Sequence, residues 1–404
     1  SIVLSLAAGA CADSTMAPTS SSPRPRALTA NEQALVTRSN AFAFSLFDEV
    51  ARQVPESSVF LSPLSASMAL GMTMNGASGT TLDAMRGALG YAGLSLGDAD
   101  ASYRSLIAML RGLDHSVDFR IANSIWYRQG LPVEQSFIDT TRTYFDATVQ
   151  GVNFDDPAAP GIINAWVRAS TNGKIDQIVG PIDPDVMMYL INAMYFKGTW
   201  QLQFDPAQTR SQPFTLEDGS TVPVQMMSLA QPTLPAAATA DYRAAELPYG
   251  GGAYVMDVVV PNAGKTVGDV LASLRGGGWD ALLGRLAPAT GDVLLPRFRL
   301  TWQASLNDPL TALGMGVAFE PGAADFSRMS SRDGHHLFIT SVKQKTFVDV
   351  NEQGTEAAAS TAVGVGVTSV EPELVRADRP FLFVIREQFT GTILFIGKLM
   401  RPPG

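Results

Sequence analysis

The stretch between Glu356 and Glu371 constrains the fold of this chain more than any other part of its sequence. It contains no charged residue, no proline and no bulky side chain, and it consists of Ala, Gly, Ser, Thr and Val. With a period of two, the face from Thr355 to Val367 is small and increasingly β-branched, and the opposite face is small or polar. A strand that is covered on both faces needs such a composition, because no charge then has to be desolvated.

The same stretch also has the composition of a loop. It is rich in Ala, Gly and Ser, and it lies between two strongly strand-like stretches. A neutral, β-prone segment that stayed permanently exposed would be an aggregation hazard. Both properties fit a segment that waits outside the fold and later becomes a buried strand. Two simpler interpretations stay open at this point, namely a flexible Ala/Gly loop and an ordinary core strand.

The rest of the composition indicates one large folded core and excludes several classes of function. Hydrophobic residues make up 46% of the 404 residues and charged residues 17%, which excludes a disordered chain and a charge-rich coiled coil. The net charge is −9 with no basic block, so we expect no binding of nucleic acid. One cysteine allows no internal disulfide, and three histidines, including the adjacent His335 and His336, leave little scope for a metal site. We therefore predict neither a metal nor a cofactor.

The N-terminal residues are typical of export and tethering. Residues 1–11 are small and apolar and end at Cys11, which resembles the remnant of a signal peptide with a bacterial lipobox. We expect Cys11 to be lipidated, with an ordinary secretory signal as the alternative. Residues 12–30 are rich in Ser, Thr, Pro and Ala and are predicted to form a flexible tether. The protein is therefore expected to be exported, extracellular or periplasmic, with a lipid tether to the membrane and a single domain over residues 31–404.

Apolar periodicity along that domain predicts an α+β fold. Helices are predicted at 31–53, 63–76, 79–89, 98–113, 134–146 and 159–172. Strands are predicted at 118–127, 187–197, 243–249, 253–260, 292–302, 336–350 and 380–398. In the second helix, Ser62 is placed as the N-cap and Pro63 as the first helical residue. Helices dominate the first half and strands the second, which favours α+β over regular βαβ repeats.

Several blocks of sequence resemble one protein family. Residues 350–359 (VNEQGTEAAA) closely resemble the hinge motif of inhibitory serpins. Further blocks that resemble the family are 60–65 (FLSPLS), 75–81 (NGASGTT), 163–167 (INAWV), 171–175 (TNGKI), 190–200 (LINAMYFKGTW), 204–205 (FD), 295–298 (LPRF) and 377–383 (ADRPFLF). They occur in family order and cover essentially everything after the tether. The chain thus resembles a serpin (serine protease inhibitor) of the bacterial inhibitory type.

This resemblance implies the serpin fold, with about nine helices, three β-sheets, a large central sheet and an exposed reactive loop at about 352–371. It also implies a suicide-substrate mechanism, in which a target serine protease cleaves the loop and the loop inserts into the central sheet with the acylated protease attached. The protein would catalyse nothing itself, and neither G-x-S-x-G nor a phosphate-loop motif occurs. A noninhibitory serpin that acts as a binding or carrier protein is the alternative, against which the hinge composition argues.

The resemblance further assigns a hinge and a reactive bond within this loop. The hinge residues are Glu352, Gly354, Thr355, Glu356, Ala357, Ala358 and Ala359. Gly354 and Thr355 are expected to enter the sheet first, from a position outside it before cleavage. Counting from the hinge places the reactive bond between Thr368 and Ser369, and counting back from Pro380 places it one residue later. The residue before the bond is then small and uncharged, which favours an elastase-like or subtilisin-like protease.

Another set of residues is assigned by resemblance to the region where the central sheet opens. The set consists of Ser62, Ser65, Asn192, Trp200 and Gln344. Gln344 stands where the family often has a histidine. Because an amide both donates and accepts, we expect the hydrogen-bond network to survive without histidine's pH sensitivity. The helix at 98–113, which binds heparin in some serpins, carries acidic as well as basic residues, so we expect no glycosaminoglycan partner. We also expect the protein to be a monomer.

Overall fold

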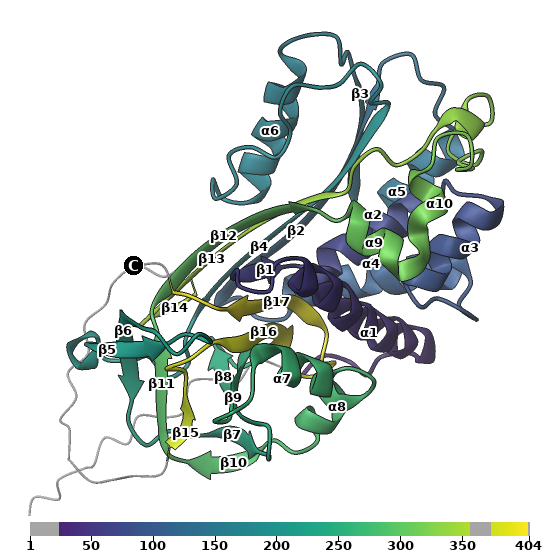
Figure 1. The fold of residues 1–404 in the computed structure, drawn as a ribbon. Coiled ribbons are helices and arrows are strands. Elements are labelled where there is room, and N and C mark those ends of the chain that lie inside the picture. The colour runs from purple at the N-terminus through teal and green to yellow at the C-terminus, as the bar shows by residue number, and fades with distance from the viewer. Residues whose placement is uncertain (1–23, 356–372, 403–404) are drawn as a thin grey trace, which may run out of the picture.

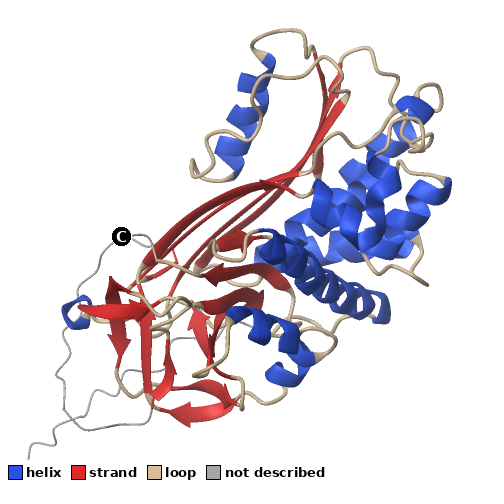
Figure 2. Ribbon diagram, viewed as in Figure 1, coloured by secondary structure: helices blue, strands red, loops and turns tan. Residues whose placement is uncertain are grey.

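Three β-sheets and a group of helices make up the fold in a computed structural model that describes residues 24–355 and 373–402 (Figures 1 and 2). The α-helices of the described residues are α1 (Ala30–Gln53), α2 (Pro63–Met74), α3 (Gly79–Ala88), α4 (Leu96–Gly112), α5 (Gln135–Phe145), α6 (Ala159–Ser170), α7 (Val267–Leu274), α8 (Gly278–Leu283) and the single turns α9 (Asn307–Leu310) and α10 (Gly316–Phe319). The predicted α+β fold with three sheets is confirmed.

The central sheet has six strands in the order β12-β13-β14-β4-β2-β3. Its strands are β12 (Phe298–Ser305), β13 (Lys343–Asn351), β14 (Gly354–Thr355), β4 (Met188–Thr199), β2 (Val117–Arg128) and β3 (Ala147–Val152). Helices α1 to α5 lie on one side of this sheet, and α6 lies on the other (Figure 1). Ile163 of α6 packs there in a small core with Trp126 of β2 and Ile191 of β4.

The other two sheets lie toward one end of the central sheet, and the seven-stranded sheet packs against it there (Figure 2), with the rings of Phe298 and Phe383 5.1 Å apart between centroids. One has seven strands, β1 (Val59–Leu61), β17 (Ile393–Leu399), β16 (Phe381–Glu387), β9 (Tyr254–Pro261), β8 (Tyr242–Tyr249), β7 (Thr233–Ala238) and β10 (Ala287–Thr290). The smallest has β15 (Glu373–Arg376), β11 (Asp292–Pro296), β6 (Thr221–Leu229) and β5 (Arg210–Thr215). Every residue of β9, β16 and β17 is buried, because these strands are covered on both faces.

Two of the runs that were each predicted as one strand are divided into two strands in the structure. The run at 292–302 is divided between β11 and β12, which lie in different sheets on either side of Arg297. The run at 380–398 is a hairpin of β16 and β17. Its turn is held by the Glu387 carboxylate, which accepts hydrogen bonds from the backbone N–H groups of Phe389 and Thr390 at 2.7 Å each. The predicted strand at 336–350 begins later, at Lys343.

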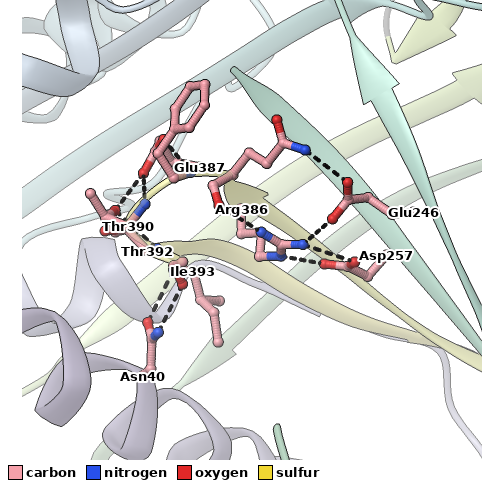
Figure 3. A network of polar contacts seen from close by, with 11 residues as sticks. Asn40, Glu246, Asp257, Arg386, Glu387, Thr390, Thr392 and Ile393 are labelled. Atoms are coloured by element: carbon pink, nitrogen blue, oxygen red, sulfur yellow. Dashed lines mark hydrogen bonds and ion pairs between the residues drawn. The ribbon is translucent and has the colours of Figure 1, made fainter. Parts of the chain in front are cut away.

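A buried ionic network fixes β16 to its neighbours (Figure 3). The Arg386 guanidinium donates to the Asp257 carboxylate of β9, with 2.7 Å between Nε and Oδ2, and to the Glu246 carboxylate of β8. Gln388 Nε2 donates to the other Glu246 oxygen at 2.9 Å. Beside this network, Asn40 of α1 accepts from the Ile393 N–H at 3.1 Å, so helix, hairpin and sheet are joined by polar contacts as well as by packing.

Candidate functional site

The central sheet is divided into two halves that β14 joins at one end. Gly354 and Thr355 pair with Asn351 and Val350 of β13 on one side, and with Thr199 and Gly198 of β4 on the other. Both pairings are antiparallel, so β13 and β4 run parallel to each other. Among the described strands, β14 alone connects them, and it is two residues long. The remaining lengths of β13 and β4 thus form the two edges of a site where a strand can be added.

The position of Thr355 corrects the expectation that the hinge lies outside the sheet before cleavage. Thr355 is 2% exposed, and its hydroxyl lies 2.6 Å from the hydroxyl of Tyr249. Gly354 has a φ of +154°, and a Cβ there would lie 2.0 Å from the carbonyl oxygen of Gly198. The chain therefore enters the sheet at Gly354 because glycine alone permits this backbone contact, and Thr355 follows because its side chain is small and finds a polar partner.

Trp200 and Tyr249 form an aromatic pair that supports the hinge. Their rings are stacked with centroids 4.3 Å apart at an angle of 14°. The Trp200 indole donates to the carbonyl oxygen of Asn351 at 2.9 Å, and its backbone N–H donates to that of Gln353 at 2.7 Å. Burial raises the pKa of Tyr249, which keeps the hydroxyl protonated beside Thr355. Trp200 therefore lies at the hinge and not with the other residues assigned to sheet opening.

Glu352 fixes the start of the hinge through an ion pair. The residue is 2% exposed, and its carboxylate accepts from Arg297 Nε at 2.6 Å and from the Thr209 hydroxyl. Burial disfavours the charged form of Glu352, but the hydrogen bonds from Arg297 and Thr209 outweigh it, so the pKa of Glu352 lies below its ordinary value. Residues 352–355 are thus held at both ends, by an ion pair at Glu352 and by a hydroxyl pair at Thr355.

The first turn of α2 lies beneath the divided part of the central sheet. Ser62 caps the helix as predicted, since its Oγ accepts from the Ser65 N–H at 3.3 Å, and Pro63 follows at the first turn. Gln344 of β13 makes a reciprocal pair with the backbone of Ser62, accepting from its N–H at 2.9 Å and donating to its carbonyl at 2.8 Å. Gln344 thus both donates and accepts, as its amide chemistry predicts.

Asn192 lies on the opposite side of this divided region, on β4. The Ser65 hydroxyl donates to the Asn192 carbonyl oxygen at 3.5 Å, and the Asn192 amide donates to Asn123 of β2. Its side-chain oxygen Oδ1 is buried and has no hydrogen-bond partner. The N-terminus of α2 therefore bridges the two halves of the sheet, through Ser62 to Gln344 and through Ser65 to Asn192. Asn192 Oδ1 is an unpartnered acceptor on the β4 side of this region.

Three residues of the hinge were not singled out as site residues in the sequence, namely Thr209, Tyr249 and Arg297. Tyr249 comes just before three consecutive glycines, and Arg297 stands between the apolar ends of two strands. Neither pattern indicates a partner at the hinge, because Tyr249 and Arg297 are 106 and 55 residues from the groups that they contact. Thr209 carries no local signal.

Other predicted site residues lie elsewhere or outside the described residues. Glu356, Ala357, Ala358, Ala359, Thr368, Ser369 and Cys11 lie outside them. His335 and His336 are in a single turn (Gly334–His336), and in residues 24–355 and 373–402 no three His, Cys, Asp or Glu side chains are grouped to hold a metal ion. Over the same residues, no helix is both long enough and apolar enough to span a membrane.

Comparison with known proteins gives a consistent result. The family model for Serpin (serine protease inhibitor) matches residues 37–402. An uncharacterized serpin-like protein of Thermococcus kodakarensis is 33% identical over 381 residues, which cover 92% of this chain and 86% of the relative. The native structure of the thermophilic serpin tengpin is 29% identical, with a TM-score of 0.83, and the match covers 95% of this chain and 97% of tengpin. Human thyroxine-binding globulin complexed with thyroxine is 25% identical, with a TM-score of 0.84, over 93% of this chain and all of that chain. The archaeal and human sources give no support to a bacterial origin, which stays a prediction.

Proposed function

The chain belongs to the serpin family, and from this we propose that it inhibits serine proteases as a suicide substrate. The observation that carries the proposal is β14, which already pairs with β13 and β4 where the two halves of the central sheet are otherwise unconnected in the described chain. The sequence that follows Glu356 is neutral and small over its whole length up to Glu371. Strand addition from this start would therefore desolvate no charge between these two glutamates.

The register of β14 specifies how insertion would continue. Each further residue of the loop would lie one position earlier along β13 and along β4. In that register Thr361 comes beside both Gln344 and Asn192, on the same face as Thr355. We propose that the Thr361 hydroxyl then donates to Asn192 Oδ1, the acceptor without a partner before insertion. Insertion would thus join the two halves of the sheet above α2.

The target and the chemistry follow from the reactive bond. We propose that the protease serine attacks the carbonyl carbon of Thr368, releasing the Ser369 amine, and that insertion removes the acyl-enzyme from its hydrolytic geometry. A small residue at Thr368 suits a shallow specificity pocket of the elastase or subtilisin kind. Incubation with a protease panel should give one band near the sum of both masses that survives SDS.

The variant Thr368→Arg should move inhibition from elastase-like to trypsin-like proteases, because arginine reaches the acidic pocket of the latter. Mass spectrometry of the released C-terminal fragment locates the bond, and a fragment that begins at Val370 would support the register one residue later. Cleavage of the wild-type loop with undiminished protease activity throughout the panel would contradict inhibition. It would favour the noninhibitory alternative, a binding or carrier protein, as thyroxine-binding globulin is for thyroxine by its name.

We also propose that the protein is exported and tethered to a membrane through lipid on Cys11, as the N-terminal sequence predicts. Expressed with its leader, the wild type should partition into detergent, and Cys11→Ala should be found in the periplasm or medium. Phase partition in Triton X-114 measures the difference, with the serpin detected by antibody. Equal partition of the two proteins would remove the lipid tether and leave the inhibitor proposal intact. The monomeric state and the absence of a glycosaminoglycan partner stay predictions.

A further inference from the structure

Three arginines surround a pocket at the junction of the seven-stranded and four-stranded sheets. We call it the arginine pocket, and its volume is about 580 Å³. Arg243 of β8 lines one side, Arg376 of β15 and Arg379 line another, and the β9 end contributes Asn262. Glu373 is the one carboxylate in the lining of this pocket among the described residues. Asp378 lies outside the lining and pairs with Arg379, so the lining itself presents three guanidinium groups and one carboxylate.

The three arginines differ in how far their donors are used. Arg376 is engaged, since it donates to the Glu373 carboxylate with 2.8 Å between Nε and Oε1, and to Gln212 at 3.3 Å. Arg379 donates to Asp378 through Nε at 3.0 Å, which leaves both terminal nitrogens without a partner in the described part of the chain.

Arg243 is exposed and has no carboxylate partner among residues 24–355 and 373–402. Its Nη1 donates to the backbone carbonyl of Glu373 at 2.7 Å, and its other nitrogens are unpaired within those residues. Planar guanidinium groups with several free N–H donors bind carboxylate and phosphate groups in a bidentate manner. The free donors of Arg243 and Arg379 thus line one pocket, the first from β8 and the second from the loop between β15 and β16.

We propose that the arginine pocket binds a small polyanion that carries at least two carboxylate or phosphate groups. One anionic group meets Arg243 on β8, and a second meets Arg379 beyond β15, with Arg376 adding its charge from between them. Such a ligand joins the seven-stranded sheet to β15, the strand that follows the reactive loop. The binding does not depend on protease inhibition, so its test and the test of the proposed function fail separately.

Calorimetric titration of the full chain with citrate and with tripolyphosphate tests the proposal. Acetate and sodium chloride at matched ionic strength are the ligand controls. Arg243→Gln and Arg379→Gln each remove one guanidinium that has unpaired donors, and Arg104→Gln removes an exposed arginine of α4 as the matched control. We expect each pocket variant to bind about tenfold more weakly, because a charge-assisted hydrogen bond is lost, and Arg104→Gln to bind as the wild type does. All variants are compared by far-UV circular dichroism and thermal melting, since these side chains lie at the surface.

The two ligands distinguish the chemistry, since preference for citrate indicates a polycarboxylate and preference for tripolyphosphate a phosphorylated molecule. The proposal is overturned if neither ligand binds more tightly than acetate at equal ionic strength, or if Arg104→Gln weakens binding as much as Arg243→Gln. It is also overturned if no ligand binds while Arg243→Gln slows inhibition of a protease, because the pocket then contacts acidic groups on the docked protease.

Discussion

Thr355→Arg should convert the protein from an inhibitor into a substrate. Thr355 is buried between β13 and β4, and the Tyr249 hydroxyl is its polar partner. An arginine there would expel β14 from the sheet, and insertion after cleavage would then have to bring an unpaired cation into this dry site, which costs several kcal/mol. Each ~1.4 kcal/mol added to the insertion barrier slows insertion about tenfold, whereas deacylation takes place in the protease and is unchanged. The variant should be cut at the same bond and released, and titration of the protease should show a stoichiometry far above that of the wild type.

The same substitution should also affect the uncleaved protein, because the hinge is already in the sheet. The melting temperature of intact Thr355→Arg should fall, and expulsion of β14 from the sheet limits the loss. Thr355→Val is the matched control, since it keeps the shape and removes only the hydroxyl opposite Tyr249. We expect Thr355→Val still to inhibit. Its free energy of unfolding should fall by ~1 kcal/mol, because the Tyr249 hydroxyl loses its partner. Unchanged stoichiometry for Thr355→Arg would show that insertion through this hinge is not the mechanism.

Local sequence patterns predicted the elements of this fold well where one segment determines its own structure. The helix at 63–76 was predicted from the cap at Ser62 and the proline at its first turn, and α2 has both. The strand predictions at 118–127 and 187–197 match β2 and β4 within two residues at each end. Caps and periodicity act within a few residues, so they can be seen in the sequence without knowledge of the fold.

The candidate site depended on contacts that no local pattern contains. The family resemblance selected Thr355, but its place inside the sheet depends on Gly198 and Tyr249, which come from other strands. Trp200 was grouped with Gln344, and in the structure it is stacked on Tyr249 at the hinge. Pairing between distant strands is determined by tertiary packing, which is why composition could suggest a strand that is added later and could not show where it starts.

Arg386→Met should destabilise the protein more than a typical core substitution. The residue is 3% exposed, and its guanidinium is shared by the buried carboxylates of Glu246 and Asp257 (Figure 3). Removing the cation leaves two carboxylates uncompensated in a dry site, and breaking a buried ion pair in this way costs ~3–5 kcal/mol. Urea denaturation at pH 7.5 should therefore show a loss of that order in the free energy of unfolding.

The pH dependence of this loss separates charge from packing. Burial raises the pKa of both Glu246 and Asp257 above the ordinary values, and the Arg386 cation counteracts part of that rise. Without Arg386 both pKa values rise further, so the folded state binds protons more tightly than the unfolded state. In the variant, the stabilising contribution of these two carboxyl groups is fully present below their ordinary pKa values and is lost as the pH rises through the raised ones. The loss in the free energy of unfolding of Arg386→Met should therefore shrink from pH 7.5 to pH 5. The triple variant E246Q/D257N/R386M keeps the shapes without the charges and should recover most of the loss at pH 7.5, because no carboxylate is then left without a cation. A deficit that is equal at both pH values, and that the triple variant retains, would instead attribute the loss to packing around the Arg386 side chain.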